Sequence, residues 1–119
     1  MPTRLIHESL CTSRSLAQCS AKAQDAYVRF LLYADNFGCF EIDAQVMRGS
    51  LWPLRKDISA KMIDQFLGEY ETHGMLQTWT GEGKRYGHFL NWPKFQRTWD
   101  GAKRRTPHPP KLATSRNEA

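Results

Sequence analysis

The sequence predicts one α+β domain, mainly α, in which a three-helix body precedes a C-terminal β-hairpin. Up to Gly74, apolar residues recur at three- and four-residue steps, which is the period of helices buried on one face. The pattern then changes to two strand-like segments on either side of a glycine-rich turn. The length of 119 residues suits a single domain and is too short for two of full size.

The first long helix is predicted over about residues 20–36, with Ser20 as its N-cap. Asn36 or Gly38 ends it, because glycine readily adopts the left-handed conformation that is common at helix ends. The apolar face consists of Ala23, Ala26, Tyr27, Phe30, Leu31 and Ala34.

A short strand is predicted at Cys39–Ile42, and two further helices follow it. The second helix begins after Asp43 and ends at Pro53, whereas the third begins after Ser59 and ends at Gly74. Their apolar positions are Val46, Met47, Leu51 and Trp52, and then Met62, Ile63, Phe66, Leu67 and Tyr70.

The hairpin consists of strands at Met75–Thr80 and Arg85–Leu90, joined by the turn Gly81–Lys84. The second and third helices form a helix-turn-helix candidate, and a hairpin directly behind it gives a winged helix-turn-helix with the hairpin as wing. We therefore expect an N-terminal extension over residues 1–19, a winged-helix domain over 20–98 and a disordered basic tail over 99–119.

The basic excess lies in the last third of the chain. The sequence has 17 Lys+Arg against 12 Asp+Glu, a net charge of +5, and residues 81–119 contain nine of these cations but only three of the acids. This asymmetry favours a polyanionic partner, nucleic acid before membrane. A solvated tail that merely keeps the protein soluble is equally consistent with it.

Other classes of protein lack support in the sequence. The longest apolar run, Phe30–Ala34, is far shorter than the roughly 20 residues of a membrane span, and no secretory signal is visible. Cys11, Cys19 and Cys39 have no zinc-ligand spacing, which predicts reduced thiols and no metal. No phosphate-binding glycine motif or catalytic constellation occurs, so we expect a cytoplasmic protein that is not an enzyme and has no cofactor.

Four segments in this order carry a resemblance: Ala34–Phe40, Leu51–Arg55, Gly83–Tyr86 and Asn91–Arg97. Over about residues 3–98 the chain resembles the N-terminal winged-helix domain of phage and prophage replication proteins. These include replisome organisers and relatives of the bacterial primosome protein DnaD. The resemblance implies DNA binding in replication initiation or its control, at the nucleoid of a bacterial host, often with self-association through the winged helix.

The predicted DNA contacts lie at the turn, the third helix, the wing tip and the tail. Lys61 and Gln65, near the start of the third helix, are the candidates for reading bases. Duplex DNA is favoured over single strands, because most of the tryptophans have the spacing of core residues. The candidates for phosphate contacts are Arg48, Arg55, Lys56, Lys84, Arg85, Lys103, Arg104 and Arg105.

A second interpretation is open, because the exposed face of the third helix also carries Asp64, Glu69 and Glu71. Carboxylates repel the phosphates that line a groove. In this interpretation the chain is an oligomerisation or replisome-interaction module with little direct DNA binding. Gly68, in the middle of the same helix, costs about 1 kcal/mol relative to Ala and predicts the close approach of another helix.

Overall fold

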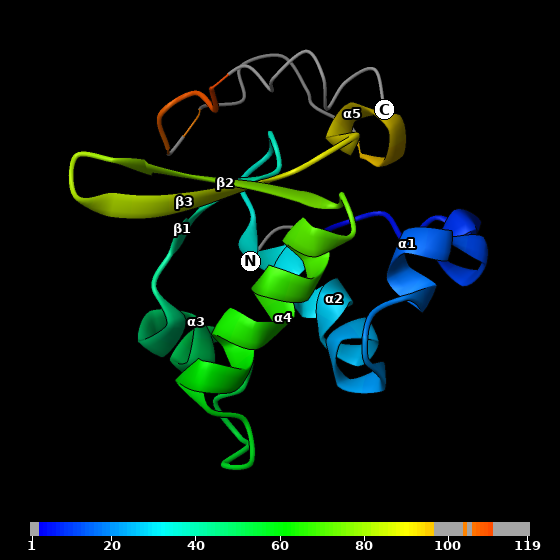
Figure 1. Cartoon of the computed structure of the whole chain (residues 1–119), viewed down its shortest axis with the longest axis horizontal. Coiled ribbons are helices and arrows are strands. Elements are labelled where there is room, and N and C mark those ends of the chain that lie inside the picture. The colour runs from blue at the N-terminus through cyan, green and yellow to red at the C-terminus, as the bar shows by residue number, and fades with distance from the viewer. Residues whose placement is uncertain (1–2, 97–103, 105, 111–119) are drawn as a thin grey trace.

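Helices cover one face of a three-stranded antiparallel sheet in the computed structural model, which describes residues 3–96, 104 and 106–110 (Figure 1). The fold is therefore α+β and mainly helical. The elements are η1 (Glu8–Thr12), α1 (Arg14–Ala17), α2 (Ala21–Tyr33), β1 (Cys39–Ile42), α3 (Ala44–Leu51), α4 (Ala60–Thr72), β2 (Leu76–Gly81), β3 (Lys84–Phe89) and α5 (Trp92–Phe95).

The helix starts follow from local side-chain chemistry. The side chains of Ser20, Asp43 and Ser59 each accept a hydrogen bond from the backbone N–H three residues later, which confirms the three predicted N-caps. These bonds satisfy N–H groups that have no partner inside the helix.

The first long helix ends at Tyr33, earlier than the predicted 36. Asp35 is the cause, because its buried carboxylate accepts hydrogen bonds from the backbone N–H groups of Phe37 (2.9 Å) and Cys39 (3.0 Å) and turns the chain. Gly38 completes this turn with a φ of +83°. A Cβ at Gly38 would also lie only 2.6 Å from the Trp92 ring, so the position requires glycine on two counts.

The predicted strand at Cys39–Ile42 is confirmed and joins the hairpin, giving the strand order β1-β3-β2. Cys39 and Gln77 both lie opposite His88, so these three residues form one row across the sheet. The β2–β3 turn has positive φ at Glu82 (53°) and Gly83 (79°), whereas Gly81 pairs with Lys84 at the end of the ladder. The predicted turn is therefore confirmed, but a glutamate, Glu82, occupies one of its two positions with left-handed backbone conformation.

The core lies between the helices and the inner face of the sheet. Phe30 of α2, Tyr70 of α4 and Phe89 of β3 are almost completely buried. Phe30 and Tyr70 meet edge to face, with ring centroids 5.6 Å apart, an arrangement that aromatic rings favour. The Tyr70 hydroxyl donates a hydrogen bond to the carbonyl of Ala23, which links α4 to α2.

Two details of the predicted packing are wrong. Val46 is 53% exposed, because the buried side of the short helix α3 follows Met47 and Leu51, and Val46 is turned about 100° away from Met47. Gly68 is exposed, and no described atom lies within 4 Å of the position that a Cβ would take there. The expected close approach of a second helix at Gly68 does not occur.

Candidate nucleic-acid interface

The β2–β3 hairpin is fixed against α4 by two polar contacts. Nη1 of Arg85 lies 3.5 Å from Oδ1 of Asp64, and Oγ1 of Thr78 donates a hydrogen bond to the Glu71 carboxylate. Asp64 lies between the exposed residues Lys61 and Gln65 along α4. The predicted base-reading residues thus lie on either side of a residue that contacts the turn end of the hairpin.

The hairpin cations are exposed but have acidic neighbours. Nζ of Lys84 lies 3.6 Å from a carboxylate oxygen of Glu41 on β1, and about half of the Arg85 side chain is accessible beside Asp64. Glu82 adds a further carboxylate at the exposed tip of the hairpin. Exposed ion pairs of this kind contribute little to stability, so a phosphate can replace the carboxylate partner at low cost.

Arg48 lies beside the turn and contacts its backbone. Its Nε donates to the carbonyl of Ile58 (2.8 Å) and its Nη2 to the carbonyl of Arg55 (3.1 Å). The guanidinium is half-buried and ties α3 to the loop that precedes α4. Its observed contacts therefore hold the shape of the turn.

Arg55 and Lys56 lie exposed on that loop. Arg55 forms a two-pronged contact with Asp57, in which Nε lies 2.8 Å from Oδ1 and Nη2 lies 2.5 Å from Oδ2. The hydrogen bonds from Arg55 lower the pKa of Asp57 to about 2. The pair is ionised at neutral pH and leaves little net charge at this point.

A polar hollow of about 150 Å³ lies beside the turn and adds two cations that the sequence interpretation missed. Lys22 and Arg29 of α2 line it, together with Asp25, Asp57 and Trp52. The Arg29 guanidinium lies over the Trp52 ring, 5.3 Å from its centroid, and donates a hydrogen bond to the carbonyl of Leu51. Lys22 and Arg29 are seven residues apart and share one side of the helix, a spacing that is visible in the sequence.

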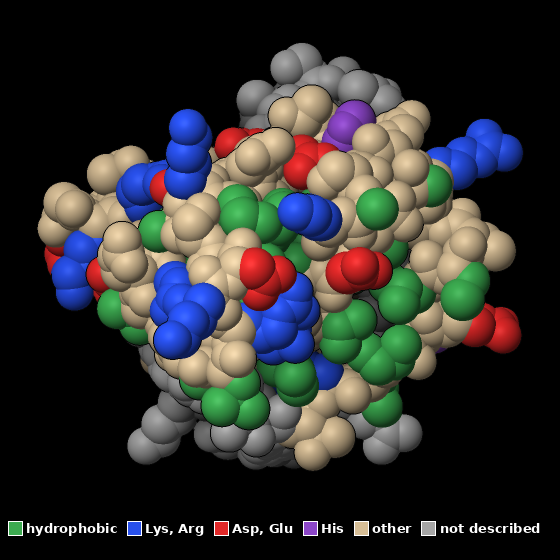
Figure 2. Space-filling view, turned by 90° about the horizontal axis from the view of Figure 1, so that it is seen from below, with side chains coloured by type: hydrophobic (Ala, Val, Ile, Leu, Met, Phe, Trp, Pro, Cys, Tyr) green, Lys and Arg blue, Asp and Glu red, His purple; other side chains and the backbone are tan. Residues whose placement is uncertain are grey.

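The lower face of the molecule shows the outcome of these pairings. In Figure 2, Lys and Arg side chains alternate with Asp and Glu, and patches of hydrophobic side chains lie between them. This face consequently has a mixed pattern of charge, and cations do not form an unbroken stripe on it.

Arg104 lies away from this surface, on the outer face of the sheet. Its Nη1 donates to Sγ of Cys39 (3.2 Å), and its guanidinium carbon lies 4.3 Å from the centroid of the Phe37 ring. Lys103 and Arg105 lie outside the described residues.

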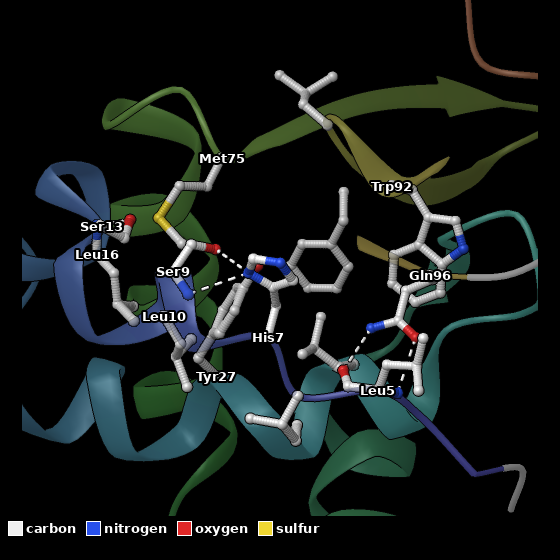
Figure 3. A pocket seen from close by; sticks show the side chains of 14 residues that line it. Leu5, His7, Ser9, Leu10, Ser13, Leu16, Tyr27, Met75, Trp92 and Gln96 are labelled. Atoms are coloured by element: carbon white, nitrogen blue, oxygen red, sulfur yellow. Dashed lines mark hydrogen bonds between the residues drawn. The ribbon is translucent and has the colours of Figure 1, made fainter. Parts of the chain in front are cut away.

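A second hollow, largely apolar and about 90 Å³ in volume, lies between the N-terminal segment and the core (Figure 3). Gln96 closes one side by donating to the carbonyl of Leu5 (2.8 Å) and accepting from the N–H of Leu5 (3.0 Å). His7 contacts Ser9 at its edge. No group of three or more potential metal ligands occurs within residues 3–96, 104 and 106–110, and this hollow gathers no catalytic cluster.

Comparison of the chain with protein-family models, with curated proteins and with solved structures found no match. In the described part of the chain, none of the helices is long and apolar enough to cross a membrane.

Proposed function

We propose that the protein binds duplex DNA as a winged helix-turn-helix of phage type and acts in replication initiation or its control. In this proposal α3 and α4 form the helix-turn-helix, α4 is the recognition helix and the β2–β3 hairpin is the wing. Lys61 and Gln65 read bases, while Lys84, Arg85, Arg55 and Lys56 contact phosphates.

The adjacency of α4 and the hairpin is the observation that carries this proposal. The Thr78–Glu71 hydrogen bond and the shared apolar core of α4 and β2 hold the two elements in one orientation, so exposed donors from both can meet the same duplex without a prior rearrangement. The carboxylates among them lower the net attraction, which predicts modest affinity with a pronounced dependence on salt.

Fluorescence anisotropy with a labelled duplex, at two salt concentrations, tests the proposal. We expect Lys84→Ala combined with Arg85→Ala to weaken binding about tenfold and to reduce the slope of log affinity against log salt by about two, since each phosphate contact adds about one. Arg14→Ala, an exposed arginine on α1, is the control and leaves the wing intact. Absence of binding at low salt contradicts the proposal.

Exposed apolar side chains favour a second candidate function, a protein-interaction module within a replisome. Leu54 is 95% exposed on the loop before α4, and Val46 projects from the neighbouring helix α3. Exposed apolar side chains that form a contiguous patch mark contacts with other proteins. Light scattering and anisotropy together separate the two functions. Self-association that Leu54→Ser abolishes, in a protein that binds no duplex at low salt, supports the interaction module.

A further inference from the structure

The described C-terminal segment, residues 104 and 106–110, lies over the face of the sheet opposite to the helices (Figure 1). It contacts the row that the strand register forms from Cys39, His88 and Gln77. Arg104 donates to Sγ of Cys39 at one end of this row, and the Gln77 side chain donates to the carbonyl of Pro110 at the other (2.8 Å). The segment is thus held at two points on opposite edges of the sheet.

Burial of this row supports a specific contact. The helices α2, α3 and α4 lie on the other side of the sheet, yet on the outer face Cys39 is 0% exposed and Gln77 is 6% exposed. Polar side chains on an uncovered face would be open to water. Here the amide of Gln77 is instead satisfied by the carbonyl of Pro110, as a buried polar group requires.

Arg104 makes the most specific contacts of the segment. Its guanidinium stacks over Phe37 at 4.3 Å while its Nη1 reaches Cys39, so both its planar face and its edge are used. With Nη1 and the planar face engaged in this way, the guanidinium cannot offer both of its terminal nitrogens to a DNA phosphate.

We propose that the outer face of the sheet is a docking surface for the chain's own C-terminal segment, with Arg104 as its main contact, and that docking withholds Arg104 from DNA. The second half of this inference rests on the proposed DNA binding, whereas the first half does not. Two other occupants of this surface would compete with the chain's own segment. One is the same segment from a second copy of the chain, and the other is a proline-containing peptide of another protein.

The rate at which Cys39 is alkylated tests the docking, with modified peptides quantified by mass spectrometry. Cys11 is exposed and Cys19 is buried in the helical body, so they serve as fast and slow references in the same molecule. We expect slow modification of Cys39 in the wild type. In Arg104→Ala we expect a rate about tenfold higher at Cys39, with Cys19 unchanged, because the segment opens more often.

Two further variants keep the result interpretable. Arg104→Lys retains the charge but loses the planar guanidinium and should give an intermediate rate, while Arg14→Ala should leave Cys39 protected. Unchanged protection in Arg104→Ala, or wild-type Cys39 reacting as fast as Cys11, overturns the docking. A wild-type rate that rises on dilution shows docking between two copies and overturns docking within one chain.

Addition of saturating duplex DNA tests the competition separately. We expect the duplex to raise the wild-type rate at Cys39, since phosphate takes Arg104 from the sheet. DNA that binds by anisotropy without changing this rate overturns the competition and leaves the proposed function standing. If no DNA binds, the proposed function and the competition both fail, and the Arg104→Ala result alone decides the docking.

Discussion

The two faces of the sheet are buried by different means. The inner face packs aromatic and aliphatic side chains against α2 and α4, with Phe30, Tyr70 and Phe89 at the centre. The outer face carries the stacked rings of Trp79 and Tyr86, and a segment distant in the sequence contacts it through a few polar and cation–π contacts. Apolar burial scales with area, whereas a handful of polar contacts gives only a small net free energy. The comparison indicates that the inner face determines stability and that the outer face is able to open.

Phe30→Ala should have the largest effect, a loss of about 3–5 kcal/mol of unfolding free energy, because it leaves a cavity beneath Trp52 and Tyr70. Phe37→Ala removes the ring beneath the Arg104 guanidinium. This variant should lose much less unfolding free energy, but its Cys39 should be alkylated faster. Chemical denaturation of both variants checks this. Equal losses would contradict the division of roles between the two faces.

Asp35→Ala should cost about 2–3 kcal/mol, because it removes the acceptor for two backbone N–H groups at a buried turn. Asp35→Asn keeps an oxygen acceptor at the same place and should recover much of that loss. Urea denaturation of the two variants provides the measurement. A result in which Asn behaves like Ala would show that the charge of Asp35, and not its hydrogen bonds, matters at this turn.

The stability of the protein should fall as the pH drops below 6.5, the ordinary pKa of histidine. Burial lowers the pKa of His88 in the folded state, and the charge of Arg104 lowers it further, while Asp35 and the Phe37 backbone act in the opposite direction. The unfolded chain therefore takes up a proton first, so the stabilisation is complete above pH 6.5 and is lost below it.

The difference between wild type and His88→Gln isolates this effect. Their unfolding midpoints, measured from about pH 8 to about pH 5, should diverge in favour of His88→Gln on the acid side. The alkylation rate of Cys39 relative to that of the exposed Cys11, a ratio that corrects for the smaller thiolate fraction at low pH, should increase over the same range in the wild type, because protonated His88 faces Arg104. Parallel midpoint curves would contradict the prediction.

Glu82→Asn should give the smallest effect, a gain of about 0.5 kcal/mol. The left-handed φ of 53° at Glu82 strains a glutamate but suits asparagine, and Asn-Gly is the preferred pair for a two-residue hairpin turn. Thermal unfolding measures the gain. Glu82→Gln, which removes the charge but keeps the side-chain shape, should leave the stability unchanged and separates conformation from electrostatics.

Local chemistry could be predicted from the sequence, and contacts between distant segments could not. The caps at Ser20, Asp43 and Ser59 depend on neighbouring residues, so their prediction was correct. For Arg48, the sequence allowed only its charge to be predicted. Its hydrogen bonds to the carbonyls of Arg55 and Ile58 depend on how the loop returns to α3. The position of Arg104 depends on a strand 65 residues earlier, and no local pattern reveals such a contact.

The hydrogen bonds between Gln96 and Leu5 join residues 91 positions apart. During synthesis on a ribosome the N-terminal residues emerge first, yet they find this partner only after the helices and the hairpin have been made. The backbone of Leu5 therefore lacks its hydrogen-bond partner until Gln96 has been synthesised. A nascent chain arrested before Gln96 would leave this end more susceptible to proteases, and its protection would report that Gln96 has reached the N-terminal segment.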